Sequence, residues 1–201
     1  MTRVSWPTWV TLVRILLIGP FLVCLLNVQQ WWAARWVGLA VFAVMAVSDA
    51  LDGFLARRLN AHTALGKFLD PVADKLLILC AVVTLATDSA SVPGKIVPNW
   101  VVVAVVGKEV VVVLGFVLIY LATGRMCLQP RPSGKICTVL QFSMVVSILL
   151  WPNLPGPLRY VPDLLWWLVT ALAAISAAEY CVVGMRFVAA AENGPQRGEK
   201  A

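Results

Sequence analysis

The sequence predicts an all-α integral membrane protein with six transmembrane helices. Hydrophobic residues make up 61% of the 201 residues and charged residues only 13%, a balance outside that of soluble domains. A helix needs about 20 predominantly apolar residues to cross a bilayer, and the chain has several such stretches separated by short polar breaks. We expect one helical domain over residues 1–191 and a polar, disordered tail at 192–201.

The six spans follow from the positions of the residues that interrupt the hydrophobic stretches. Each break carries turn or loop chemistry, such as the Asn-Val-Gln-Gln segment at 27–30 and the proline-flanked segment at 152–162. Helices end near such residues, to within a few positions. The predicted spans cover residues 8–27, 34–57, 66–88, 98–122, 134–152 and 162–188.

The positive charges predict the orientation of these spans. Cytoplasmic loops of membrane proteins carry an excess of Lys and Arg. Six spans place both termini on one side, which holds twelve of the sixteen basic residues, whereas the other side holds only Arg35, Lys95 and Arg159. We therefore expect both termini in the cytoplasm, a multi-pass protein of the cytoplasmic (inner) membrane, and no nucleic-acid partner.

Four carboxylates stand at the cytoplasmic ends of two apolar spans. Asp49 and Asp52 belong to the second span, and Asp70 and Asp74 to the third. A charged side chain at membrane depth costs at least about 2.5–3.5 kcal/mol, so four together require a compensating cation. Residues three or four positions apart share one helix face. Because the chain turns back between these spans, the two acidic faces can oppose each other.

Structural salt bridges are the alternative explanation for these aspartates. Asp52 could pair with Arg57, or Asp70 with Lys75. Such pairs account for one or two of the four carboxylates, but not for four on facing surfaces.

Converging carboxylates indicate a site for hard divalent cations. Mg²⁺ and Mn²⁺ prefer oxygen ligands, and no His or Cys accompanies the aspartates to suggest zinc. Two such ions about 3.5–4 Å apart can clamp a phosphoryl group. Gly53, Ala56 and Gly66 remove side-chain bulk near the acids, so a nucleotide could approach the backbone, and Arg57 could bind a phosphate bidentately. The pattern favours pyrophosphate chemistry.

The same residues resemble the signature of the CDP-alcohol phosphotransferases. The chain reads Asp49-x-x-Asp52-Gly53-x-x-Ala56-Arg57, then eight residues, then Gly66-x-x-x-Asp70-x-x-x-Asp74, and it matches that signature in every defined position. The segments 7–14 and 68–75 are similar to those of the phosphatidylglycerophosphate and cardiolipin synthases of this family.

The resemblance implies a homodimer of six-helix protomers with a polar cavity open to the cytoplasm. It implies two divalent ions, Mg²⁺ or Mn²⁺, held by the four motif aspartates, with Asp74 also serving as general base. The reaction would transfer the phosphatidyl group of CDP-diacylglycerol to an alcohol and release CMP, with membrane lipids around the protein. CDP would be bound by Asp49, Asp52, Gly53, Ala56, Arg57, Gly66 and Asp70.

Four basic residues outside the motif are candidates for holding a phosphate on the acceptor: Lys108, Arg125, Arg131 and Lys135. An unpaired ammonium at Lys108, inside the fourth span, would be costly. Lys108 could instead pair with an acid on another helix, because neighbouring Glu109 is expected to point elsewhere. Lys135 could instead be an anchor that reaches toward lipid headgroups.

The acceptor itself stays open between two alcohols. Glycerol 3-phosphate, giving phosphatidylglycerophosphate, is the first choice, and phosphatidylglycerol, giving cardiolipin, is the alternative. Phosphatidylglycerophosphate synthases usually show Arg-Glu or Arg-Asp in the fourth span, where this chain has Lys108-Glu109. Glu179 in the sixth span is a further membrane acid that could pair with Lys108 or Arg186, and its role is left open.

Two other classes of membrane protein also use intramembrane aspartates. A divalent-cation transporter would need polar residues threading the spans from face to face, whereas here the acids cluster near one side. A membrane prenyltransferase also uses aspartates and magnesium on a diphosphate, but its signature lacks the Gly-x-x-Ala-Arg segment and the downstream Gly-x-x-x-Asp-x-x-x-Asp.

Overall fold

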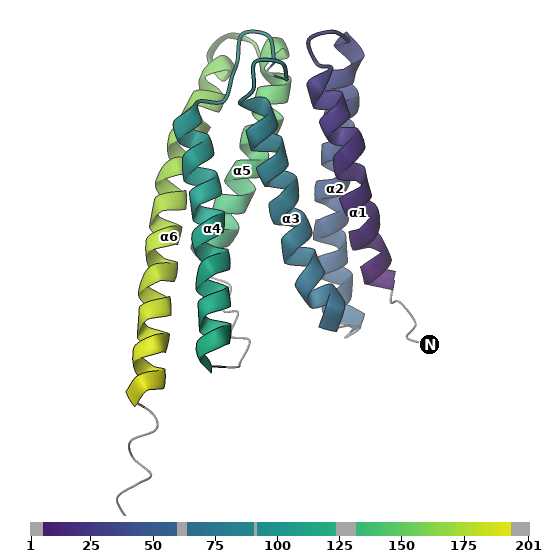
Figure 1. Cartoon of the computed structure of the whole chain (residues 1–201). Helices are drawn as coiled ribbons and strands as arrows, with labels where there is room; N and C mark the ends of the chain where they lie inside the picture. The colour runs from purple at the N-terminus through teal and green to yellow at the C-terminus, as the bar shows by residue number, and fades with distance from the viewer. Residues whose placement is uncertain (1–5, 60–63, 91, 124–131, 194–201) are drawn as a thin grey trace, which may run out of the picture.

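The chain folds into long antiparallel α-helices, as Figure 1 shows. The computed structural model describes the backbone of residues 6–59, 64–90, 92–123 and 132–193, and the side chains of 13–48, 75–90, 92–115 and 133–185. Within these ranges there is no strand, only an isolated bridge between Val92 and Lys95. The all-α class is therefore confirmed.

The elements are α1 (Trp6–Leu26), α2 (Trp32–Leu59), α3 (Ala64–Leu85), α4 (Asn99–Thr123), α5 (Pro132–Leu150), the short 3₁₀ helices η1 (Trp151–Asn153) and η2 (Gly156–Tyr160), and α6 (Val161–Asn193).

The helix ends fall within a few residues of the predicted spans except at the end of α6. This helix continues to Asn193, past the predicted limit at residue 188 and two residues into the predicted tail. Residues 189–191 are all alanine and are followed by Glu192. Alanine and glutamate are strong helix formers, so the helix outlasts the apolar segment.

Two helical stretches of the described residues have the length and composition of membrane spans. Among the residues whose side chains are described, two stretches satisfy both criteria, Ser133–Asn153 and Gly156–Met185, and shorter apolar segments lie at Val13–Leu26, Trp32–Ser48 and Lys75–Leu85. The start of α1 and the end of α6 lie at the same end of the bundle (Figure 1). This arrangement fits an even number of crossings, and the six crossings and their orientation stay predictions.

The helices pack in two groups of three. Helix α1 contacts α2 and α3, and α6 contacts α4 and α5. An aromatic stack joins the groups through Phe42 of α2, whose ring centroid lies 5.3 Å from that of Phe21 on α1 and 5.1 Å from that of Phe142 on α5. Phe21 and Phe42 are 0% and 1% exposed. The stack therefore fixes one half of the bundle against the other.

The end of the bundle remote from the motif is held by a lysine between two tryptophans. The Lys95 ammonium lies 2.7 Å from both carboxylate oxygens of Asp163, and 4.6 Å and 5.7 Å from the ring centroids of Trp166 and Trp151. Arg35 also donates to Asn153 Oδ1 at 2.6 Å. These contacts join the loop before α4 to the start of α6, and α2 to η1.

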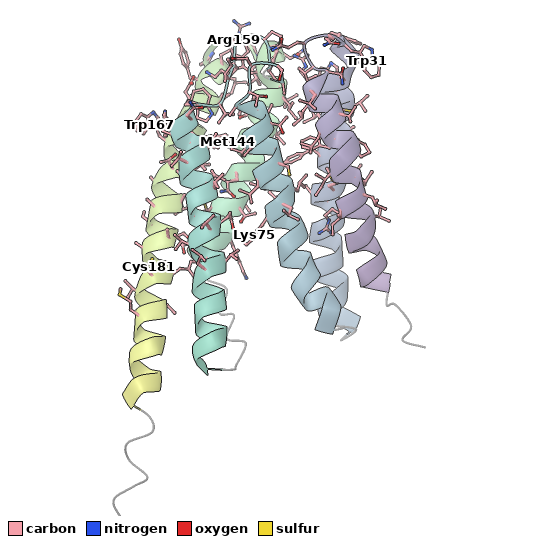
Figure 2. The ribbon with its side chains drawn as sticks, viewed as in Figure 1. Trp31, Lys75, Met144, Arg159, Trp167 and Cys181 are labelled. Carbon is pink, nitrogen blue, oxygen red and sulfur yellow. The ribbon has the colours of Figure 1, made fainter. Side chains whose placement is uncertain are left out.

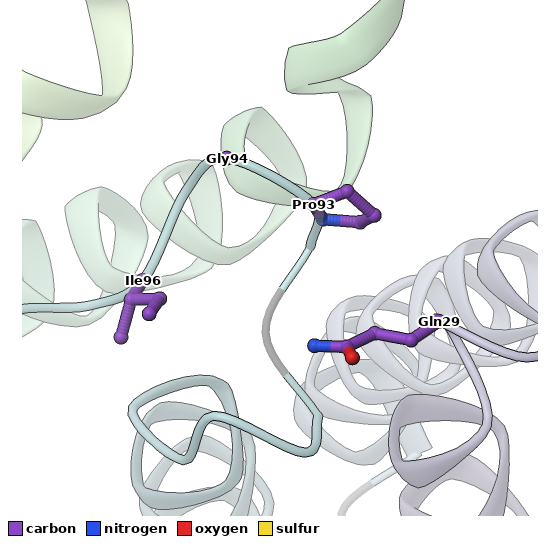
Figure 3. A pocket seen from close by; sticks show the side chains of 4 residues that line it. All are labelled: Gln29, Pro93, Gly94 and Ile96. Carbon is purple, nitrogen blue, oxygen red and sulfur yellow. The ribbon is translucent and has the colours of Figure 1, made fainter.

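An open pocket lies beside these loops, and Figure 3 shows its lining residues Gln29, Pro93, Gly94 and Ile96. Gln29 reaches the backbone oxygen of Asp88 across this region. Figure 2 labels Trp31, Arg159 and Trp167 at the same end. The pocket is thus at the opposite end of the bundle from the motif segments and is not the candidate active site.

Replacing Phe42 with alanine is expected to lower the free energy of unfolding by about 3–5 kcal/mol, because it leaves a cavity between two aromatic partners. Thermal unfolding of the purified protein in detergent measures this effect. Val44→Ala on the same helix is the control, since Val44 is 57% exposed and surface changes are usually within about 0.5 kcal/mol. Equal losses in the two variants would contradict the role assigned to the stack.

Candidate functional site

The four motif aspartates lie on consecutive helices. Asp49 and Asp52 fall in the last part of α2, and Asp70 and Asp74 in the first half of α3. The backbone is helical at all four positions, so residues of each pair are three or four apart on one helix, as expected. Their side chains lie outside the described residues, and their convergence on a metal stays a prediction.

The arrangement of α2 and α3 suits a shared site at their connected ends. Both helices pack against α1, and only residues 60–63 separate the end of α2 from the start of α3. Figure 1 shows these ends on the same side of the bundle as the start of α1 and the end of α6. The predicted nucleotide contacts Gly53, Ala56, Arg57 and Gly66 share these two helices, with side chains outside the described residues.

Lys75, the residue after Asp74, is engaged by an acid on another helix. Its ammonium forms an ion pair with Glu109 Oε2 on α4, and Figure 2 labels Lys75 between α3 and α4. The suggested structural pairing of Lys75 with Asp70 is therefore not the ion pair that the structure describes. The lysine that follows the last motif aspartate is thus paired with Glu109 on α4.

Lys108 joins the same cluster from the other side of that carboxylate. Its ammonium lies 2.6 Å from Glu109 Oε1 and 3.7 Å from Cys137 Sγ on α5. The expectation that Glu109 points away from Lys108 is wrong. Both side chains turn toward the interior of the bundle, where their side chains are only 2% and 5% exposed, because pairing lowers the cost of burying each charge.

Glu179 has a different partner from those expected. The Ser133 hydroxyl of α5 donates to Glu179 Oε2 at 2.5 Å, which joins α5 to α6. Lys108, one of the two partners considered for Glu179, pairs with Glu109 instead. The side chain of Arg186 lies outside the described residues. Glu179 thus helps to hold the start of α5, which carries Lys135, against α6.

Of the remaining candidate acceptor contacts, the structure describes only Lys135. Lys135 is exposed at the start of α5, and Arg125 and Arg131 lie outside the described residues. Among the described side chains, no group of three or more His, Cys, Asp or Glu gathers in a metal-binding cluster.

Two features of the site escaped the sequence analysis. Arg14 is one of the twelve basic residues that the sequence assigns to the cytoplasmic side. It is buried, 2% exposed, on α1, the helix that contacts both motif helices. The Lys75–Glu109 pair was also missed. Its signal in the sequence was the presence of opposite charges in two apolar spans, since such charges are costly unless they meet.

Comparison with known proteins identifies the family. The sequence model described as CDP-alcohol phosphatidyltransferase matches residues 4–174. The protein named CDP-diacylglycerol--glycerol-3-phosphate 3-phosphatidyltransferase of Bacillus subtilis (strain 168) is 34% identical over 186 residues, covering 87% of this chain and 92% of the relative. A protein of the same name from Salmonella choleraesuis (strain SC-B67) is 49% identical over 77 residues, covering 38% and 41%. A probable phosphatidylglycerophosphate synthase of Mycobacterium tuberculosis (strain CDC 1551 / Oshkosh) is 32% identical over 178 residues, covering 88% and 79%. The resemblance drawn from the aspartate motif is thus confirmed, and the chain belongs to the CDP-alcohol phosphatidyltransferase family.

Proposed function

We propose that this protein transfers the phosphatidyl group of CDP-diacylglycerol to glycerol 3-phosphate, giving phosphatidylglycerophosphate and CMP. The observation that carries the proposal is the placement of the motif aspartates on α2 and α3, two helices that are joined by four residues and both pack on α1. The names of the full-length relatives supply the acceptor, because they are called phosphatidyltransferases or synthases of this reaction.

The residues present fit a divalent metal site. All four are carboxylates, the oxygen donors that Mg²⁺ and Mn²⁺ prefer. The adjacent Lys75 is paired with Glu109, so its charge is directed to another helix. Asp49, Asp52, Asp70 and Asp74 would hold two ions, which when bound would neutralise the pyrophosphate of the substrate.

The chain's own residues would orient the two substrates and move one proton. Gly53, Ala56 and Gly66 would let the cytidine nucleotide approach the backbone, and Arg57 would bind a phosphate oxygen. Asp74 would accept the proton of the acceptor hydroxyl. That oxygen forms a bond to the phosphorus bearing diacylglycerol, the bond from this phosphorus to the bridging oxygen breaks, and CMP leaves.

The proposal places the enzyme in the cytoplasmic membrane as a homodimer, with six spans and the site facing the cytoplasm. Large apolar side chains on several helices support burial in lipid, since Leu16, Val103, Trp167 and Met185 are each more than 60% exposed. A site at the membrane surface lets a lipid donor react without leaving the bilayer. Arg125, Arg131 and Lys135 stay candidates for the acceptor's phosphate, whereas Lys108, the fourth candidate, is buried and paired with Glu109.

Release of CMP from CDP-diacylglycerol should depend on the acceptor supplied. The purified protein is incubated with CDP-diacylglycerol, Mg²⁺ and either glycerol 3-phosphate, glycerol or phosphatidylglycerol, and CMP is followed. We expect stimulation by glycerol 3-phosphate alone. Stimulation by phosphatidylglycerol would instead identify a cardiolipin synthase, and no release with any acceptor would contradict the transferase and favour a transporter.

Replacing Asp74 with asparagine should lower kcat by at least about 100-fold while the protein stays folded, because the amide cannot accept the proton of the acceptor. Turnover is measured by CMP release, and folding by the thermal unfolding midpoint. Near-normal turnover in this variant would remove Asp74 from the role of base.

Removing divalent metal should stop turnover reversibly. A chelator is expected to abolish CMP release, and Mg²⁺ or Mn²⁺ should restore it, because the pyrophosphate and the four carboxylates would otherwise repel one another. Metal that binds the folded state should also raise the unfolding midpoint. Full turnover in excess chelator would overturn the metal site.

A further inference from the structure

We propose that Lys75 contacts the anionic group of the acceptor and that Glu109 is the positioning residue that holds it there. This inference rests on the proposed function and adds two residues to it. Inside the apolar bundle, two ammonium groups share a single carboxylate. Lys75 of α3 pairs with Oε2 of Glu109, and Lys108 lies 2.6 Å from Oε1 of the same group.

The cluster has a surplus of positive charge. Two lysines and one glutamate carry one more positive than negative charge, and none of the three has a further acidic partner among the described side chains. Charge in an apolar environment favours a partner of opposite sign. An anion bound at Lys75 would balance the extra positive charge of these three side chains.

The exposure of the two lysines decides which of them meets that anion. The side chain of Lys108 is 2% exposed, and that of Glu109 5%, whereas the side chain of Lys75 is 33% exposed. Lys108 lies between the carboxylate and Cys137 Sγ on α5, 3.7 Å away. Lys75 is therefore the accessible cation, and Lys108 is the buried counter-charge behind Glu109.

The position of Lys75 suits an anion on the acceptor. Lys75 is one residue from Asp74, the proposed base, on α3. Consecutive side chains of a helix diverge, so the acceptor would extend from the Lys75 ammonium to the Asp74 carboxylate. Glu109 belongs to α4, in the other group of three helices. Its bond to Lys75 therefore fixes the lysine across the interface between the two groups. Without that carboxylate the two ammonium groups would repel each other and separate.

The test compares Lys75→Gln, Lys75→Arg and Glu109→Gln with wild type, measuring kcat and the KM of each substrate by CMP release. We expect Lys75→Gln and Glu109→Gln each to raise the KM for glycerol 3-phosphate by about tenfold or more, with the KM for CDP-diacylglycerol changed by less than about threefold. Lys75→Arg should restore most of the acceptor affinity, because it keeps the charge. The double variant should resemble the single ones, since both act on one contact.

Asp163→Asn is the matched control, because it weakens a lysine–carboxylate pair at the opposite end of the bundle. It should lower the unfolding midpoint without changing either KM. If Lys75→Gln or Glu109→Gln turns over too slowly, the glycerol 3-phosphate concentration that half-protects the protein against heat gives the same comparison. Equal changes in both KM values, or loss of stability alone, would overturn the inference. Failure of wild type to use glycerol 3-phosphate would instead overturn the proposed function.

Discussion

Charged side chains inside an apolar bundle need oppositely charged or polar partners nearby. This requirement applies at the loop end of the molecule and in its interior. Water screens and solvates exposed ions, but an ion among apolar helices must be neutralised by what surrounds it. At the loop end, Lys95 is satisfied by both oxygens of Asp163 and by the faces of two tryptophans. In the interior, Glu109 is shared by two lysines. The pair of Lys95 and Asp163 has equal positive and negative charge. The three side chains around Glu109 carry one more positive than negative charge.

This difference is the basis of the role proposed for Lys75. The Lys95–Asp163 pair has equal and opposite charges, and it joins the loop before α4 to the start of α6. The cluster around Glu109 keeps a positive charge near the motif helix α3. A phosphate-bearing acceptor would bring the opposite charge to these three side chains, which is the contribution to binding that we propose. Using Lys75 in this way also directs its charge away from the carboxylates expected to bind metal.

The packing of the helices explains how distant segments could act on one substrate. Helix α1 supports both motif helices, and α6 supports α4 and α5, which carry the basic residues. The two groups meet through the ring of Phe42 and through the ion pair between Lys75 and Glu109. The contact of Phe42 is apolar and requires close packing. The contact between Lys75 and Glu109 is an ion pair and requires that the two side chains point toward each other. A substrate bound between these groups would meet the motif aspartates and Lys75 from one group and Glu109 with its bound Lys108 from the other.

The sequence by itself determined the all-α class, the approximate ends of the helices and the family, because hydrophobic runs, turn residues and the spacing of Asp49, Asp52, Asp70 and Asp74 are local patterns. It misjudged the end of α6, where helix propensity outlasts hydrophobicity. Only the tertiary structure decided the partner of Glu109, because a helix face can meet any other face and local spacing does not say which. Spacing within one helix is fixed by the backbone, whereas contacts between helices depend on how the whole bundle packs.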